Sequence, residues 1–263
     1  MKDTGGRWET RIARARLLQG EQPAFAAALR LYQATLEFQR EIASASSSVI
    51  NLECPLREQI DIAFACSQLP AIFSIALKQG PGALGARAKA LHNEGEHTWP
   101  RLFESALHHV PSAQSEIDDY FVRACLQPIA ENLQLQLAPD QNYKKSCCPA
   151  CGGLPQLAVL RPEGEGASRS LLCSFCLREW LFRRIVCPFC GEEEKEKLPR
   201  YAAEACDYVR VEGCDACKHY LKAVDMNIDG HAVPLIDEAA WAVLDLWAAE
   251  HGYTKIVPNL IGF

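Results

Sequence analysis

Four short cysteine pairs decide the fold of this chain: CPAC at 148–151, CSFC at 173–176, CPFC at 187–190 and CDAC at 214–217. One CxxC turn presents two sulfurs to the same point, and a tetrahedral four-thiolate metal site needs two such turns. The eight cysteines are therefore predicted to form two metal sites with none left over. The predicted ligands are Cys148, Cys151, Cys173, Cys176, Cys187, Cys190, Cys214 and Cys217.

The spacing between the pairs favours one way of grouping them. Twenty-one residues separate Cys151 from Cys173 and twenty-three separate Cys190 from Cys214, but only ten separate the second pair from the third. A gap of about twenty residues suits an antiparallel excursion that returns to its start, as in the zinc pattern C-x2-C-x15–20-C-x2-C. We therefore expect the first two pairs to form one site and the last two the other. A cross-braced arrangement, first pair with third and second with fourth, stays an alternative.

The cysteine-rich stretch is also a repeat. Each half opens with CPxCG, at 148–152 and 187–191, and closes with a CxxC pair and a mixed apolar and charged run. Two copies of one small module are the simplest interpretation. The glycine after the second cysteine permits a positive φ, so that backbone N–H groups can point at the sulfurs. The second knuckle of each copy has Leu177 or Lys218 there instead, which predicts knuckles less symmetric than an electron-transfer iron site would favour.

Disulfides and redox-active dithiols are the alternatives to metal. The first sixteen residues are charged and lack the apolar core of a signal peptide, so we expect a cytoplasmic protein with reduced thiols. A thioredoxin-like motif normally comes as one CxxC within a βαβ pattern, whereas four pairs at this spacing indicate metal. Cys147 directly precedes a predicted ligand, and we interpret it as a bystander.

Composition excludes some classes of protein. The chain has 263 residues, of which 49% are hydrophobic and 23% charged, as in a globular protein. No apolar run reaches the roughly 20 residues needed to span a bilayer, so no direct membrane insertion is expected. The formal net charge is −6, and from Cys148 onward 12 Lys and Arg stand against 17 Asp and Glu. A zinc-ribbon nucleic-acid binder would need a basic surface, so this class is disfavoured and no nucleic-acid partner is expected.

Periodicity predicts an α+β chain in three parts. Residues 1–140 should form an all-helical domain of five or six helices, 147–186 a first metal-binding module, and 187–263 a second module with a C-terminal helix. The expected helices cover 7–18, 23 to the serine cluster at 44–48, 55–79 with a kink or break at Pro70, 83–92, 94–110, 113–137 and 235–251. The expected strands cover 154–160, 169–173, 179–186, 208–212 and 220–226, with exposed loops at 162–167 and 191–197. The tryptophan-rich helix at 235–251 should cover the second module or dock it on the bundle.

The four pairs, the CPxCG openings, the region around Trp180 and the helical first half together resemble the formate dehydrogenase accessory protein family, FdhE. The tail of the chain, with Tyr253 and the turn at 258–260, is similar to the ending of that family. The resemblance implies a cytoplasmic protein with a helical domain and two tandem rubredoxin-like, or zinc-ribbon-like, modules. It also implies a partner, the catalytic subunit of formate dehydrogenase, and makes iron a candidate metal beside zinc.

Three functions follow as hypotheses. The first is a non-enzymatic maturation factor, because two closed four-thiolate sites leave no vacant ligand position and no acid, base or nucleophile constellation is evident. The second is a rubredoxin-type protein in which bound iron carries one electron, against which Leu177 and Lys218 count. The weaker third hypothesis is the zinc-ribbon nucleic-acid binder, which the charge disfavours.

Overall fold

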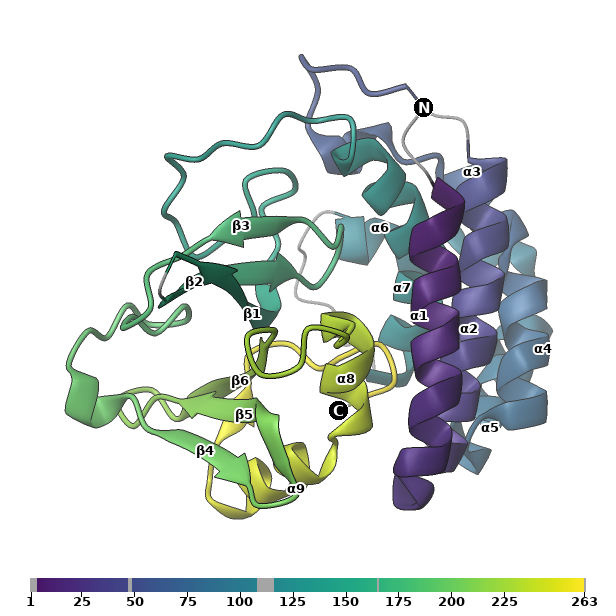
Figure 1. The fold of residues 1–263 in the computed structure, drawn as a ribbon. Coiled ribbons are helices and arrows are strands. Elements are labelled where there is room, and N and C mark those ends of the chain that lie inside the picture. Colours follow the sequence, from purple (N-terminus) through teal and green to yellow (C-terminus); the bar gives the residue numbers. More distant parts are fainter. Residues whose placement is uncertain (1–3, 47–48, 108–115, 165, 263) are drawn as a thin grey trace. The chain divides into compact units, whose positions relative to one another are not determined.

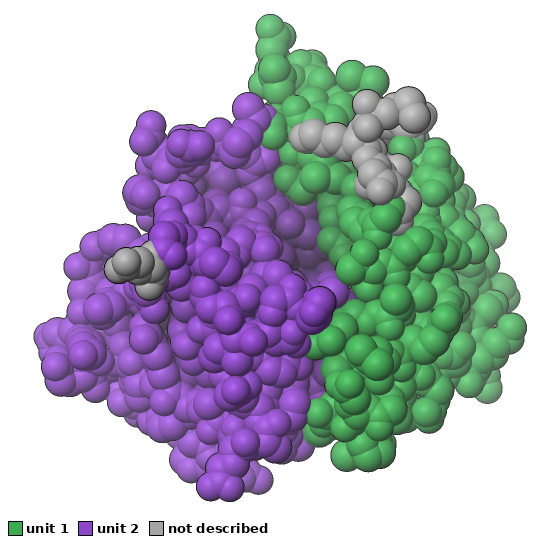
Figure 2. Space-filling view, in the orientation of Figure 1, with its two compact units in different colours: residues 1–137, 260–262 green, residues 138–259, 263 purple. Residues whose placement is uncertain are grey.

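The computed structural model describes residues 4–46, 49–107, 116–164 and 166–262. The chain divides into two compact units (Figure 2). Unit 1 comprises the described residues up to Leu137 together with Leu260–Gly262, and unit 2 comprises those from Ala138 to Asn259. The α+β fold class predicted from the sequence is confirmed, with helices first and both four-cysteine groups in the second unit.

Unit 1 is helical, and seven α-helices lie within its described residues. Their bounds are α1 Thr4–Glu21, α2 Ala26–Ala45, α3 Ile62–Ser67, α4 Leu69–Gln79, α5 Gly82–Glu94, α6 Pro100–Leu107 and α7 Glu116–Gln134, with short 3-10 turns at Pro23–Phe25, Leu56–Gln59 and Glu96–Thr98. Helices α1 and α2 lie side by side and antiparallel (Figure 1). The expected count of five or six is corrected, because the helix predicted over 55–79 is broken at Gln68, two residues before Pro70. The ends predicted at 110 and 113 lie outside the described residues.

Aromatic packing and one ion pair hold unit 1 together. The ring of Phe73 on α4 meets Trp99 edge-on at 5.6 Å and Phe121 of α7 at 5.3 Å between centroids. Such edge-to-face contacts add about 0.5–1.5 kcal/mol each to the burial of the rings. The guanidinium of Arg11 on α1 donates to both carboxylate oxygens of Glu131 on α7, at 2.7 and 2.9 Å. These contacts join α1 and α4 to α7 within unit 1.

One stretch of the described residues, Ile62–Gln79, is apolar and long enough to cross a membrane by composition and length, with a mean hydropathy of 1.2. The structure divides it into two helices of six and eleven residues. On α4, Leu69, Ile72, Phe73 and Ala76 are buried among the other helices of unit 1. In the described structure 28% of the stretch is buried, so one face of α4 packs in the core of unit 1 while Leu77 is 48% exposed.

Unit 2 is built on one mixed sheet. Its strands are β1 Pro155–Glu163, β2 Gly166–Cys173, β3 Glu179–Leu181, β4 Arg200–Ala203, β5 Cys206–Gly213, β6 His219–Asp225 and β7 Thr254–Lys255. Neighbouring strands follow the order β3-β2-β1-β6-β5-β4, and β7 pairs with the start of β6. Apart from the two-residue strand β7, which runs parallel to β6, the pairing within each half is antiparallel, and the two halves join through the parallel pair β1 and β6 (Figure 1). The sheet therefore consists of two three-stranded repeats, which agrees with the repeat seen in the sequence.

The structure corrects three details in unit 2. The region 162–167 is not a loop throughout, since Pro162 pairs with Ala167 and the strands turn around Gly164 at φ 57°. Strands β4 and β7 were not predicted. The single helix expected over 235–251 is two helices, α8 Pro234–Ala240 and α9 Val243–Glu250, separated at Trp241.

The C-terminal helices cover the second half of the sheet. Trp241 and Leu244 join a buried cluster with Val209 and Val211 of β5 and Val224 of β6. Cys206, one of the cysteines outside the four pairs, belongs to the same cluster, where it acts as a small apolar residue. The prediction that this helical region covers the second module is confirmed.

Candidate metal centres

Each of the four cysteine pairs adopts the same knuckle. In every pair the N–H of the first cysteine donates to the carbonyl oxygen five residues later. These bonds run from Cys148 to Gly153 at 2.8 Å, Cys173 to Arg178 at 2.9 Å, Cys187 to Glu192 at 2.8 Å and Cys214 to His219 at 2.9 Å. The bond closes the turn, so that both cysteine side chains of a pair face the same point.

The residue after the second cysteine has a left-handed backbone in all four knuckles. In the first knuckle of each repeat it is glycine, with φ 72° at Gly152 and 82° at Gly191. In the second knuckles it is Leu177 at φ 56° and Lys218 at φ 58°, and these two are the positive-φ residues other than glycine among the described residues. The asymmetry expected from the missing glycines is therefore wrong at the level of the backbone. The hydrogen bond that closes the knuckle fixes the left-handed turn, so Leu177 and Lys218 adopt it in spite of the steric cost of their Cβ atoms.

Backbone N–H groups point at the sulfurs in both repeats. The N–H groups of Ala150, Phe175 and Phe189 each lie 3.4 Å from the sulfur two residues earlier. The N–H groups of Glu192 and His219 also donate to the sulfurs of the second group, those of Cys190 and Cys217. Hydrogen bonds of this kind stabilise thiolates and tune the potential of a bound metal.

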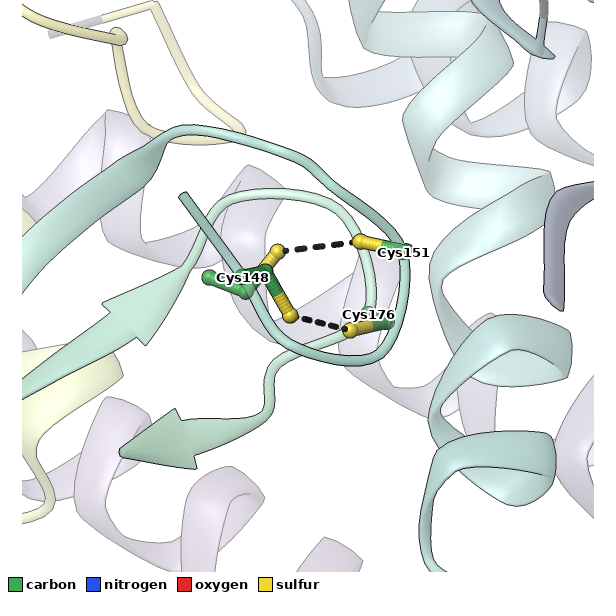
Figure 3. Close-up of side chains that lie close together, drawn as sticks. Cys148, Cys151 and Cys176 are labelled. Atoms are coloured by element: carbon green, nitrogen blue, oxygen red, sulfur yellow. Dashed lines mark hydrogen bonds between the residues drawn. The ribbon is translucent and has the colours of Figure 1, made fainter. Parts of the chain in front are cut away.

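The knuckles meet in the pairs that the spacing favours. In the first group, Cys148 lies 3.5 Å from Cys176 and Cys151 lies 3.4 Å from Cys173, measured between sulfurs (Figure 3). The second group contains Cys187 and Cys190 from one knuckle and Cys214 and Cys217 from the next, with sulfur distances of 3.8 and 3.6 Å across it. All four sulfurs of each group lie within 4.8 Å of one another. The cross-braced alternative is not the arrangement found.

These distances fit a tetrahedral metal ion in each group. Four sulfurs at about 2.3 Å from a central zinc ion lie about 3.8 Å from one another. A disulfide would bring two sulfurs to about 2.05 Å, and the thirteen cysteines are free in the described structure. Each group could therefore hold one metal ion, and the four thiolates of each group would be its ligands. That these eight residues bind metal stays a prediction.

The two groups differ in their exposure to solvent. All four cysteines of the first group are buried. In the second group Cys190 is exposed and Cys217 is half-buried. The first group is screened in part by the connector after Leu137, because Arg178 donates to the carbonyl of Ala138 and the Trp180 indole donates to that of Lys145. The second group is thus the one that solvent and other molecules can reach.

Burial acts on the thiols of both groups. It is the main cause that raises the pKa of Cys173 well above its ordinary value, and it raises the pKa of Cys187 to about 11. Without a cation the thiols of Cys173 and Cys187 therefore stay protonated at neutral pH, whereas a bound metal ion would hold them as thiolates.

Cys147 does not join either group. Its sulfur lies 3.2 Å from the hydroxyl of Tyr143, and it is absent from the sets of sulfurs that converge in the described residues. The bystander role expected for Cys147 agrees with this position. The left-handed Leu177 and Lys218 are the features of the site that the sequence analysis missed. The signal was present, since both follow the second cysteine of a pair, as Gly152 and Gly191 do.

The chain is similar in sequence and in fold to proteins that share one name. Residues 185–261 match the family model for FdhE, C-terminal domain. The resemblance to the FdhE family seen in the sequence is thereby confirmed. The matched segment contains the whole second four-cysteine group, strands β4 to β7 and helices α8 and α9.

Curated relatives carry the same name. A protein named Protein FdhE homolog from Aquifex aeolicus is 34% identical over 149 residues, which cover 55% of this chain and 52% of the relative. A Protein FdhE homolog from Pseudomonas aeruginosa is 37% identical over 153 residues, covering 54% of this chain and 48% of the relative. The chain therefore matches about half the length of these FdhE homologues.

A solved structure shares the fold. The crystal structure of the FdhE protein from Pseudomonas aeruginosa superposes with a TM-score of 0.72 at 24% sequence identity, and the match covers 100% of this chain and 96% of that chain. The fold of this chain is therefore shared with an FdhE protein of known structure.

Proposed function

We propose that this protein is a cytoplasmic, non-enzymatic accessory protein that binds the catalytic subunit of formate dehydrogenase and is needed for its activity. The single observation that carries the proposal is the FdhE match at residues 185–261, which contains a complete four-cysteine group. Closed four-thiolate sites typically contribute folding energy and leave no open position for a substrate. A protein with two such sites and no evident catalytic constellation is suited to act by binding another protein.

The proposed metal is iron or zinc, one ion in each group. Both ions accept four thiolates in tetrahedral geometry, and the sulfur distances of 3.4 to 3.8 Å suit either. The eight cysteines would hold the metals, and the surrounding N–H groups would stabilise the thiolates.

Deletion and pull-down test the accessory function together. Deleting the gene should abolish or sharply reduce formate dehydrogenase activity, and a tagged copy should capture the catalytic subunit from cells that make the enzyme. A copy carrying Cys187→Ala should fail to restore activity because it loses a ligand, whereas the matched Cys147→Ser copy should restore it. Unchanged formate dehydrogenase activity in the deletion strain would refute the proposal.

A second candidate function is one-electron transfer by bound iron, as in rubredoxin. The observation that favours it is the common left-handed turn of all four knuckles, together with the backbone N–H groups that point at sulfurs in both groups. Protein purified without oxygen should then contain iron and show a reversible one-electron potential. A colourless protein that contains only zinc would exclude this function.

A further inference from the structure

A cavity lies directly beside the second four-cysteine group. Its volume is about 260 Å³, and its wall includes Cys187 and Cys214 of that group. The wall also carries four cationic side chains and one carboxylate: Arg169, Arg184, Lys195, Arg200 and Glu212. All of its lining residues belong to unit 2. In a chain with a net charge of −6, this local excess of positive charge is an exception.

The one carboxylate of the wall is already shared. Glu212 accepts from Arg169 at 2.9 Å and from Arg210 at 3.2 Å, and it lies 3.8 Å from Arg200. Although burial of the Arg200 guanidinium is the main cause that lowers its pKa, the neighbouring arginines lower it further. Because one carboxylate faces four cations, Glu212 offsets only part of the positive charge of the wall.

Among the described residues, two of the cations have no carboxylate partner. Arg184 donates only to the carbonyl of Ala167, at 3.2 Å, and no ion pair involves Arg184 or Lys195 among the described residues. The acidic run at 192–194 is engaged elsewhere, since Glu193 pairs with Arg183 at 2.6 Å and Lys197 pairs with its acidic neighbours. Arg184 and Lys195 are therefore available to an anion from outside the chain.

The rest of the wall and its rim are apolar. Ile185 lines the cavity and is 46% exposed, and Val186, Leu198 and Ile256 complete the apolar part. Phe189, 45% exposed, stacks on His219 of the wall with 3.7 Å between ring centroids. Exposed apolar side chains beside unpaired cations are typical of a protein-binding surface rather than of a site for a small inorganic ion.

We propose that this cavity binds an acidic peptide segment of a protein partner, with carboxylates on Arg184 and Lys195 and apolar side chains against Ile185 and Phe189. The proposal rests on the proposed function only in that the ligand belongs to a partner protein. The simplest alternative is that the cations do no more than offset the negative charge of a four-thiolate metal centre. The two readings differ in whether an acidic peptide binds.

The test uses the full chain loaded with zinc and a short labelled peptide in which glutamate and leucine alternate. The peptide should bind with an affinity that falls as salt is raised, and its glutamine counterpart should not bind. In ¹⁵N spectra the amides of residues 184–186, 195–198 and 200 should shift, while those of unit 1 should not. The double variant Arg184→Ala, Lys195→Ala should bind about tenfold more weakly, because two exposed ion pairs are lost.

A control variant removes the same charges elsewhere. Lys144 and Arg101 are exposed and do not line the cavity, so Lys144→Ala, Arg101→Ala should bind the peptide as the wild type does. Both double variants should retain two metal ions per chain. Absence of peptide binding, equal loss in both variants, or free acetate or phosphate binding as tightly as the peptide would each overturn the proposal. Failure of the capture of formate dehydrogenase, with peptide binding intact, would instead refute the proposed function alone.

Discussion

The left-handed backbone at Lys218 leads to a quantitative prediction. Glycine should be more stable than alanine at this position, which reverses the usual order. A left-handed conformation costs a residue with a Cβ about 1–2 kcal/mol, whereas glycine adopts it freely but loses about 0.5–1 kcal/mol more backbone entropy on folding. The difference leaves Lys218→Gly more stable than Lys218→Ala by about 0.5–1 kcal/mol.

Comparing Lys218→Gly with Lys218→Ala isolates the contribution of the backbone conformation to the free energy of unfolding. The ion pair of Lys218 with Asp215, 2.6 Å long, and its ammonium contact with the Tyr253 ring at 5.2 Å are lost equally in both variants. Lys218 suits the test better than Leu177, which is buried and would lose about 1.5–3 kcal/mol of apolar burial when truncated.

The assay is urea unfolding of zinc-loaded protein at one fixed concentration of free zinc, because the bound metal adds to the stability. The same two substitutions at Leu246, which is 51% exposed within α9, should show the ordinary order of stability, with alanine above glycine. There Leu246→Gly should be less stable than Leu246→Ala by about 1 kcal/mol. If glycine at 218 is less stable than alanine by a similar amount, the strained-knuckle argument is refuted.

Three further predictions concern the metal centres and the buried charges. A chelator should remove the metal of the second group before that of the first, as metal release over time with a colorimetric chelator would show, because the first group is fully buried. Cys148→Ser should lower the metal content towards one ion per chain, whereas Cys147→Ser should leave it at two. Burial raises the pKa of Glu238, but the charge of Lys222 helps to lower it, and the net change is from 4.5 to about 2. The ionised carboxylate therefore stabilises the fold above pH 4.5, and this contribution is lost as the pH falls towards 2. The wild type should exceed Glu238→Gln in free energy of unfolding by about 3 kcal/mol near neutral pH, and acid unfolding curves should show this difference shrinking between pH 5 and 3.

The predictable parts of the structure are those that depend on residues close together in the sequence. A CxxC knuckle is closed by a bond between residues five apart, so the four turns follow from local sequence. Grouping of the turns followed from the length of the connecting segments, and the break near Pro70 followed from the ring that proline introduces.

The parts that were missed depend on contacts distant in sequence. Strand β7 has two residues and exists because Thr254 and Lys255 pair with the start of β6, more than thirty residues earlier. The break between α8 and α9 at Trp241 accompanies a hydrogen bond from its indole to Tyr208 at 3.0 Å. Hydrophobic periodicity registers neither contact, because β7 is only two residues long and the Trp241 bond joins polar atoms of two aromatic side chains.

The two repeats share a backbone but not an environment, and this difference bears on what each centre can do. The parallel pair of β1 and β6 joins the repeats, while the first group is screened in part by the connector held at Arg178 and Trp180. The second group instead has Cys190 and the exposed ring of Phe189 at the surface and the cationic cavity beside it. A metal held by four buried thiolates can stabilise the fold but can hardly meet another molecule, whereas one with an exposed ligand can do both. Effects on a partner are therefore expected to originate at the second group, and loss of stability at the first.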